Sequence, residues 1–278
     1  MLRLPDTLLS QLLAEDVPHG DLTTHLLGVK DAPARMSFAA RGHMVVACVE
    51  EAARIIELAG GSVLLHCRSG DSLPDRSPIL EADGPAEALL AAWKVAQNLV
   101  ESASGIAGAV RAMVEAAQKG GGASVACTRK SFPGTRAIAL KAVAAGGGVA
   151  HRLGLSDSIL VFPEHRAFLQ GDLSAHMLRL RREVPEKKLV AEVCSRDEAL
   201  ILADAGVDVL QLEKFPPQEV AELALALRMM GQPPVLAVAG GVNPGNAEAY
   251  VRAGAQVLVT SAPYWAKPSD VQVRIYPA

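Results

Sequence analysis

The sequence predicts an α/β protein in which a parallel α/β barrel of six strands follows an α+β domain. Three observations lead to this prediction. From residue 121 onward, short Val/Leu/Ile runs alternate with longer helical patterns, as in repeated βαβ units. Charged, hydroxyl or glycine residues follow every one of these runs. In the first 115 residues, apolar and polar residues instead alternate as they do in antiparallel strands.

The expected barrel strands are continuous apolar runs, which is typical of a parallel sheet buried on both faces. They are 123–127, 157–162, 187–193, 207–213, 233–240 and 255–261. The helical patterns that follow are 135–146, 173–184, 195–206, 217–230 and 243–254. Six strands fit either an open doubly wound sheet or a barrel. An open sheet concentrates ligand contacts at one switch point, whereas a barrel gathers all strand ends at one mouth. The even spread of polar residues favours a barrel, smaller than the usual eight strands.

The chain is expected to divide near residue 115. Residues 1–115 predict an α+β sandwich domain with linking helices, and residues 116–268 predict the barrel. The tail 270–277 has the pattern of one more strand, and we expect it to pair with the N-terminal sheet.

Two strand-like stretches, 34–50 and 61–74, enclose a helical pattern at 50–60. They are followed by one long helical region, 82–119, which we expect to be interrupted around SASG (102–105) and at Gly108 because glycine lowers helix propensity.

Composition narrows the function classes. Half of the chain is apolar and its net charge is −3, which argues against a general polyanion binder. Aromatic residues make up only 4%, which disfavours a base-stacking nucleic-acid surface. None of the four cysteines forms a C-x-x-C pair, so we expect reduced thiols in a cytoplasmic protein rather than a zinc site. No apolar run approaches membrane-spanning length.

A basic stretch without acidic neighbours is the strongest local signal. From Ala116 to Ser156 there is not one Asp or Glu. The basic residues of this stretch are Lys119, Arg129, Lys130, Arg136, Lys141, His151 and Arg152. A solvated surface normally mixes charges of both signs. Because Arg and Lys bind carboxylates and phosphates, the stretch predicts a site for a small anion.

Two carboxylates, Glu192 and Glu213, follow the third and fourth expected strands. At a barrel mouth they would face the same space as the cations. Paired carboxylates suit Mg²⁺ or hydroxyl groups, and they also stabilise a developing sugar cation. The alternative is that they are only counterions of Arg129 or Lys214.

Gly240 and Gly241 end the fifth expected strand, and Thr260 and Ser261 end the sixth. Backbone amides of such a turn, next to a helix N-terminus, suit a phosphate, and phosphate sites of barrels typically use the loops after the last strands. A plain tight turn is the alternative. Together these features indicate a phosphorylated sugar and a second, anionic substrate, joined at the anomeric carbon of the sugar.

Several motifs resemble one known family over nearly the full chain. They are EDVPHGDLTT, ASGIAG, TRKSFPGTR, AGGGVAHRLGLSDSILVF and AGGVN. The family is that of the nicotinate-nucleotide pyrophosphorylases, also called quinolinate phosphoribosyltransferases. The resemblance implies an N-terminal sandwich and an incomplete α/β barrel. It also implies transfer of a phosphoribosyl group from phosphoribosyl pyrophosphate (PRPP) with Mg²⁺ and no organic cofactor, and a homodimer in which the neighbour's N-terminal domain covers each barrel mouth.

The resemblance also implies roles for individual residues. Arg129, His151 and Arg152 would hold the carboxylates of the acceptor, and Lys130 would contact the phosphoribosyl donor. Glu192 and Glu213 would serve ribose hydroxyls and Mg²⁺, so that Lys130, Glu192 and Glu213 form the catalytic set. The residues implied to hold the 5′-phosphate and the donor are Lys130, Lys214, Gly240, Gly241 and Ser261.

The chain departs from the family pattern around the acceptor. Lys94 stands where the family has an Arg that reaches the neighbouring active site. Phe162 begins the run FPEH, where the family has Lys-Asp-Asn-His. The lost Lys touches both substrates in the family. Glu213 and Lys214 replace an Asp and an Asn, and Ala239 replaces a Ser.

These departures resemble the ModD branch of the family, a branch associated by name with molybdate transport. AWKVAQN, TRKSFPGT, LVFPEHR and VTSAPYWAKP carry that likeness. The leading hypothesis is a phosphoribosyltransferase whose acceptor is a small carboxylated aromatic other than quinolinate. Quinolinate phosphoribosyltransferase activity in NAD biosynthesis is the second hypothesis. A non-enzymatic protein that binds molybdate or another oxyanion is the third.

Overall fold

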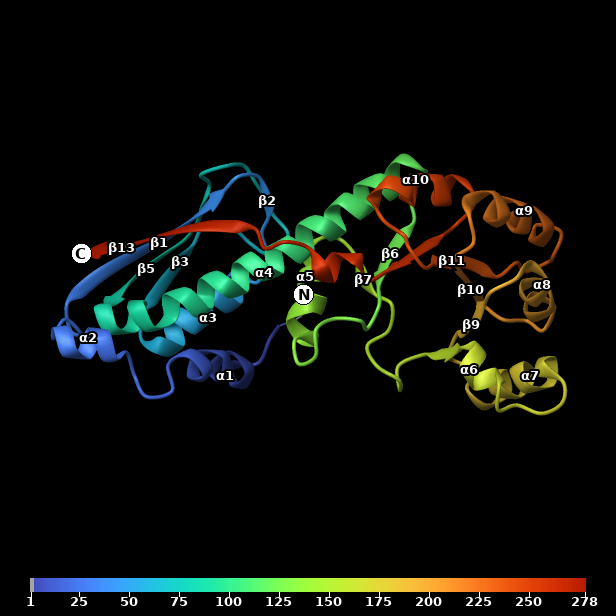
Figure 1. The fold of residues 1–278 in the computed structure, drawn as a ribbon, viewed down its shortest axis with the longest axis horizontal. Helices are drawn as coiled ribbons and strands as arrows, with labels where there is room; N and C mark the ends of the chain where they lie inside the picture. Colours follow the sequence, from blue (N-terminus) through green and yellow to red (C-terminus); the bar gives the residue numbers. More distant parts are fainter. Residues whose placement is uncertain (1–2) are drawn as a thin grey trace. The chain divides into compact units, whose positions relative to one another are not determined.

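The structure is a computed structural model that describes residues 3–278, and its chain forms two compact units (Figure 1). Unit 1 comprises Met1–Arg111, Ser131–Gly147 and Pro263–Ala278. Unit 2 comprises Ala112–Lys130 and Gly148–Ala262. Among the described residues, no helix combines the length and the apolar character needed to cross a bilayer.

Unit 2 is built on one parallel sheet whose strand order is β7-β6-β12-β11-β10-β9-β8. The strands are β6 (Ser124–Cys127), β7 (Val149–Ala150), β8 (Ile159–Val161), β9 (Leu189–Val193), β10 (Val209–Glu213), β11 (Val235–Ala239) and β12 (Val257–Thr260). β7 and β8 are the two edges and do not pair with each other. The sheet is therefore an incomplete barrel, as expected.

The helices of unit 2 follow the strands in alternation. They are α6 (Pro163–Arg166), α7 (Leu173–Glu183), α8 (Arg196–Asp204), α9 (Pro217–Leu227) and α10 (Pro244–Arg252). Leu210 and Leu212 of β10 belong to the large core cluster formed with these helices. Because side chains alternate along a strand, Val209, Gln211 and Glu213 point to the opposite face. The small core cluster of Ala237, Ala239 and Val259 packs there with Val209, and its small side chains leave space inside the barrel.

The sequence predicted six strands, and the structure adds a seventh, β7. Its two residues pair in parallel with Ala126 and Cys127 of β6. A two-residue pairing is too short to produce an apolar run that a periodicity argument detects. The prediction was therefore wrong in strand number, although each of the six expected runs contains an observed strand.

Unit 1 contains an antiparallel sheet of order β13-β1-β5-β3 and a short β2-β4 pair. The strands are β1 (Pro33–Arg41), β2 (Met44–Val45), β3 (Ser62–Leu65), β4 (Ser72–Leu73), β5 (Pro78–Pro85) and β13 (Asp270–Pro277). The other elements are α1 (Asp6–Asp16), α2 (Leu22–Leu27), α3 (Val49–Ala59), α5 (Arg136–Ala145) and most of α4 (Ala86–Lys119) and of the 3₁₀ turn η1 (Ala262–Trp265). The last residues of α4 and the first residue of η1 belong to unit 2. β13, the expected C-terminal strand, pairs with β1 along its whole length, and α3 and α4 lie along the sheet (Figure 1).

α4 is one uninterrupted helix, which corrects the expected breaks at 102–105 and Gly108. The small residues Ser104 and Gly105 instead allow other segments to pack closely against α4. A Cβ on Gly105 would lie 2.3 Å from the carbonyl oxygen of Lys267, so glycine allows that segment to lie against the helix. The buried Ser104 hydroxyl accepts a hydrogen bond from Ala47 N–H at 2.9 Å.

α5, expected within the barrel domain 116–268, groups with unit 1 instead. A buried ion pair explains this grouping. Lys141 Nζ lies 2.5 Å from Glu51 Oε2 and 3.0 Å from Glu50 Oε2, both on α3. Lys141 and Glu51 are each 4% exposed, and removing one partner would leave a buried charge unpaired. Lys141 is therefore not one of the cations available to a ligand.

Two glycines of α4 give a matched test of this packing. We expect Gly105→Ala to lower the free energy of unfolding by about 1–3 kcal/mol, the usual cost of forcing atoms into a packed site. A Cβ on Gly108 meets nothing within 4 Å, so Gly108→Ala should stabilise the helix by roughly 0.5–1 kcal/mol. Denaturant unfolding of both variants measures the two free energies. Equal effects of the two changes would contradict the packing role of Gly105.

Candidate active site

The barrel mouth of unit 2 holds a cavity of about 340 Å³. Its wall includes most of the site residues predicted from the sequence: Arg129, Lys130, His151, Arg152, Phe162, Glu192, Glu213, Gly240, Gly241 and Ser261. They come from the C-terminal ends of β6, β7, β8, β9, β10, β11 and β12. Residues more than 130 positions apart in the chain therefore meet at one place because all the strands are parallel.

The basic wall comes from two neighbouring strand ends. His151 N–H donates to the Cys127 carbonyl at 2.9 Å and extends the β6–β7 pairing. His151 and Arg152 consequently lie beside Arg129 and Lys130, which follow β6. Burial first, and then the positive charge of Arg152, lowers the pKa of His151. The imidazole is therefore neutral near pH 7 and able to donate one hydrogen bond.

The Arg152 guanidinium is buried without an acidic partner. Its residue is 7% exposed, and burial together with Arg129 lowers its pKa. Within residues 3–278, no carboxylate forms an ion pair with Arg129, Lys130 or Arg152. A buried charge without a partner is costly to the folded state. The arrangement thus favours binding of an anion.

Phe162 supplies an apolar surface next to these cations. The Arg152 guanidinium carbon lies 5.6 Å from the centre of its ring, within range of a cation–π contact. Phe162 N–H donates to His165 Nδ1 at 3.0 Å, and the two rings stack with centres 5.8 Å apart. Phe162 is therefore held in place at the start of α6 and cannot itself pair with a carboxylate.

The acidic wall consists of Glu192 on β9 and Glu213 on β10. Gln211 Nε2 donates to Glu192 Oε2 at 2.6 Å. Burial raises the pKa of Glu192, the Gln211 hydrogen bond lowers it, the nearby Glu213 and Glu164 raise it, and Lys130 lowers it. The net effect is a raised pKa for Glu192, so the folded protein by itself disfavours a negative charge on this side chain.

Gly240 is required at its position by two constraints. Its φ is +85°, and a Cβ there would lie 2.6 Å from Lys214 Cγ and 2.8 Å from Glu213 Oε1. Gly241 also has a positive φ of +86°. The side-chain amides of Asn243 and Asn246 both donate to the Gly241 carbonyl, at 3.0 and 3.1 Å. These bonds fix the turn before α10, whose N-terminus favours negative charge.

The last strand completes the turn region. The buried Thr260 hydroxyl donates to the Val242 carbonyl at 3.0 Å and accepts from Ala262 N–H at 3.2 Å. It therefore ties the β12 end to the loop after β11. Ser261, the next residue, lines the cavity and has a hydroxyl suited to a phosphate oxygen.

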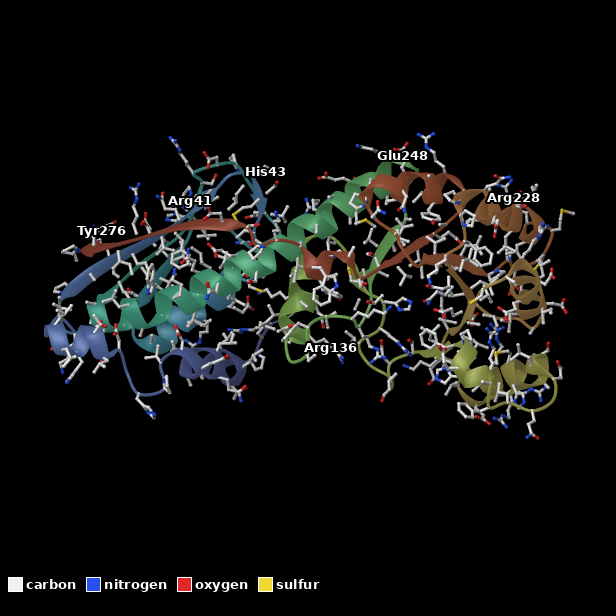
Figure 2. The ribbon with its side chains drawn as sticks, in the orientation of Figure 1. Arg41, His43, Arg136, Arg228, Glu248 and Tyr276 are labelled. Carbon is white, nitrogen blue, oxygen red and sulfur yellow. The ribbon has the colours of Figure 1, made fainter. Side chains whose placement is uncertain are left out.

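Two predicted site residues do not line this cavity. Lys214, with φ +61°, donates its backbone N–H to the Ala239 carbonyl at 2.8 Å and acts there through its main chain. Lys94 is exposed on α4 in unit 1, where its Nζ donates to Gln97 Oε1 at 3.0 Å. Arg136, labelled in Figure 2, is likewise exposed at the start of α5 and belongs to unit 1.

Gln211 was not among the site residues predicted from the sequence. This residue lines the cavity between Glu192 and Glu213. The sequence does contain a signal for Gln211. It lies two residues before Glu213 in the same strand, and because side chains alternate along a strand, both lie on one face. A single polar residue within an apolar run was not enough to identify it.

The carboxylates fit one of the roles expected of a Mg²⁺ site. Within residues 3–278 no group of three or more His, Cys, Asp or Glu side chains is arranged to hold a metal ion. Mg²⁺, however, is commonly bound by one or two carboxylates together with substrate phosphates. Glu192 and Glu213 meet that requirement only when a phosphorylated ligand supplies the remaining oxygens.

Two domains of one known family match most of the chain. Residues 21–104 match the N-terminal domain of quinolinate phosphoribosyl transferase, and residues 106–274 match its C-terminal domain. The chain is 50% identical over 256 residues to "Putative pyrophosphorylase ModD" of Rhodobacter capsulatus, covering 91% of this chain and 98% of that protein.

Two further similar proteins bear other names. The nicotinate-nucleotide pyrophosphorylase [carboxylating] of Mycobacterium leprae is 32% identical over 256 residues, covering 90% of this chain and 89% of that protein. The crystal structure of NadC from Streptococcus pyogenes superposes with a TM-score of 0.90 at 25% identity, over 100% of both chains.

The raised pKa of Glu192 predicts that its charge lowers the stability of the folded protein near neutral pH. A group with a raised folded-state pKa contributes stability below its unfolded pKa, and this contribution is lost as the pH rises through the folded value. We expect Glu192→Gln to match wild type in melting temperature near pH 4 and to exceed it increasingly towards pH 7. Thermal unfolding across pH measures the difference. A melting temperature below wild type at pH 7 would show that the charge stabilises the fold.

Proposed function

Because the chain belongs to the quinolinate phosphoribosyl transferase family, we propose that it transfers the phosphoribosyl group of PRPP to an anionic heteroaromatic acceptor other than quinolinate. Pyrophosphate is the leaving group. The observation that supports this proposal most directly is the division of one cavity into a basic wall, an acidic wall and a glycine turn, with Phe162 beside the basic wall.

The glycine turn and the acidic wall suit the sugar donor. Gly240, Gly241 and Ser261 would bind the 5′-phosphate, and Lys130 would contact the pyrophosphate. Glu192 and Glu213 would accept hydrogen bonds from the ribose hydroxyls. Mg²⁺, when bound with the donor, would be held by these carboxylates and would neutralise charge on the pyrophosphate.

The reaction breaks the bond between the anomeric carbon and the pyrophosphate oxygen, which leaves with the electron pair. A ring nitrogen of the acceptor provides the pair for the new C–N bond. Positive charge develops on the sugar between these events. The fixed carboxylates of Glu192 and Glu213 would stabilise that charge, because oriented charges in a water-poor site need little reorganisation.

The basic wall suits the carboxylate of the acceptor. Arg129 and Arg152 offer charged donors, and the neutral His151 offers one more. Phe162 offers a ring face in place of a second set of charged contacts. An acceptor with fewer carboxylates than quinolinate, or with a larger apolar edge, would match this combination better.

Retention of quinolinate as acceptor is the second candidate. Its support is that Arg129, His151 and Arg152, which the family resemblance assigns to the acceptor carboxylates, all line the cavity. A non-enzymatic oxyanion-binding role remains as the outcome if PRPP does not bind.

Pyrophosphate release tests the proposal. Protein, PRPP and Mg²⁺ are incubated with quinolinate and with a panel of pyridine and other heteroaromatic mono- and dicarboxylates. Release with an acid other than quinolinate supports the proposal and identifies the acceptor. Release with quinolinate at ordinary enzyme rates supports the second candidate. If PRPP fails to bind with Mg²⁺, phosphoribosyl transfer is wrong.

Replacing Phe162 tests the specificity argument. Phe162→Lys restores a cation at the acceptor wall, and one charge-assisted contact contributes roughly 1.5–3 kcal/mol. We therefore expect quinolinate to bind about ten- to a hundredfold more tightly, measured by titration calorimetry. Phe162→Leu, which keeps the position apolar, is the matched control and should leave quinolinate binding weak. Equal quinolinate affinity of both variants would contradict a selective role for Phe162.

We also propose that the chain acts as a homodimer in which Lys94 of one copy completes the cavity of the other. The support is the family resemblance at AWKVAQN, together with the location of Lys94 in unit 1 rather than in the cavity wall. Lys94→Ala and Glu213→Gln should each lose most activity. Mixing the two variants should then restore up to about a quarter of wild-type activity, because a quarter of the sites contain neither change under random exchange.

Sedimentation measures the oligomeric state in the same samples. Recovery in the mixture requires exchange of subunits, so the variants are unfolded and refolded together. A monomer, or a mixture with no more activity than its components, would contradict the shared site.

A further inference from the structure

Arg166 does not line the cavity of unit 2, but it is joined to a residue that does. It is the last residue of α6 and of the motif LVFPEHR. Its backbone N–H donates to the Phe162 carbonyl at 3.2 Å. Phe162 directly precedes α6 and lines the cavity. The position of α6 therefore sets the position of the Phe162 ring.

Apolar packing does not hold α6 in place. The helix has four residues, and none of them is buried. It follows β8, an edge strand of the parallel sheet whose neighbour among the described strands is β9. A helix of this length is not stable by itself. Its place beside the cavity therefore depends on polar contacts with neighbouring elements.

One ion pair links α6 to α8. Arg166 Nη1 lies 3.3 Å from Glu198 Oε1. The Arg166 side chain is 12% exposed, whereas Arg196, which pairs with Glu222, is 53% exposed. Water and salt weaken exposed pairs, so the pair of Arg166 is the better defined of the two. Within residues 3–278, it is the ion pair that α6 forms.

Glu198 connects this pair to the acidic wall of the cavity. Its second oxygen, Oε2, accepts a hydrogen bond from Cys194 N–H at 3.0 Å, and Cys194 lies two residues after Glu192. The backbone N–H of Glu198 donates to Ser195 Oγ at 3.3 Å, which caps α8. One carboxylate thus holds the end of β9 with one oxygen and α6 with the other.

We propose that Arg166 is a positioning residue. Through Glu198 it fixes α6 against α8, and it thereby holds the Phe162 ring at the acceptor wall, where the ring selects the acceptor. Rigid support of this kind keeps a binding group in its productive geometry. The inference rests on the proposed function only for the identity of the ligand. The placement of the ring concerns side chains of this protein and is testable without substrate.

The first measurement follows the Phe162 ring itself. Protein made with 4-fluorophenylalanine carries five labelled rings, and Phe162→Leu assigns one ¹⁹F NMR signal by its loss. Arg166→Met is similar in length to arginine but has no charge. In this variant the Phe162 signal should shift towards that of free 4-fluorophenylalanine and become narrower, because the ring is no longer held.

Three further variants identify the ion pair as the cause. Glu198→Gln keeps an oxygen for Cys194 N–H but loses the charge, so it should shift the Phe162 signal in the same direction. Combined with Arg166→Met it should add no further shift, because both changes remove one contact. Arg196→Met removes another interhelical pair of α8 and is the matched control. It should leave the Phe162 signal unchanged.

The second measurement is quinolinate binding by titration calorimetry. In the wild-type background, Phe162→Lys should tighten binding about ten- to a hundredfold. In the Arg166→Met background the same change should tighten it less than about threefold, because the lysine is no longer held at the wall and coupled residues are not additive. In the Arg196→Met background the full gain should remain. Melting temperatures verify that each variant is folded, and Glu198→Gln takes the place of Arg166→Met if the latter unfolds.

The outcomes separate the inference from the proposed function. An unchanged Phe162 signal in Arg166→Met overturns the positioning role, even if the melting temperature falls, because the pair would then be only structural. An equal gain from Phe162→Lys with and without Arg166 also overturns it. If PRPP does not bind, phosphoribosyl transfer is wrong, whereas a shifted ring signal together with a lost quinolinate gain still supports the role of Arg166.

Discussion

Positive charge without acidic neighbours is the constraint on which the site depends. Arg152 is buried beside Arg129, and no carboxylate of the described chain pairs with either guanidinium. Across the same cavity, Glu192 is held with a raised pKa near a second carboxylate. Each wall is unfavourable by itself because like charges repel and burial removes water. A ligand with a carboxylate at one end and hydroxyls or a developing cation at the other relieves both walls at once.

Parallel β topology is what brings these charges together. Each strand delivers its last residues to one edge, so the basic wall comes from β6 and β7 and the acidic wall from β9 and β10. The side chains beneath are small, with Ala237, Ala239 and Val259 on the interior face. A barrel filled by larger side chains would leave no space for a substrate at this depth.

Much of this arrangement follows from the sequence, and the failures have identifiable causes. The six apolar runs, and the polar residues after them, were sufficient to place Glu192, Glu213 and the glycine turn at one mouth. β7 was missed because a strand of two residues is too short to show an apolar pattern. It is nevertheless the strand that brings His151 next to Cys127. Lys141 was taken for a ligand-binding cation because its partners, Glu50 and Glu51, lie some 90 residues earlier.

The remaining errors in the sequence-based predictions arose because a residue type was given a single structural role. Gly105 was taken for a helix break, but its missing side chain admits the carbonyl of Lys267. Gln211 was counted as part of an apolar strand, although it shares a face with Glu213. In both places the decisive contact is with a segment distant in the chain, and local patterns carry no information about that segment.

The pairing of β13 with β1 has a consequence for biosynthesis. β1 spans Pro33–Arg41, and β13 spans Asp270–Pro277. During translation, β1 leaves the ribosome long before its neighbour exists, since all the strands of unit 2 are made between them. Domains generally fold in the order of their synthesis, but this sheet has an unpaired edge until the barrel sequence is complete. Until β13 is made, the nascent chain therefore presents an open strand edge, which is a template for pairing with other chains.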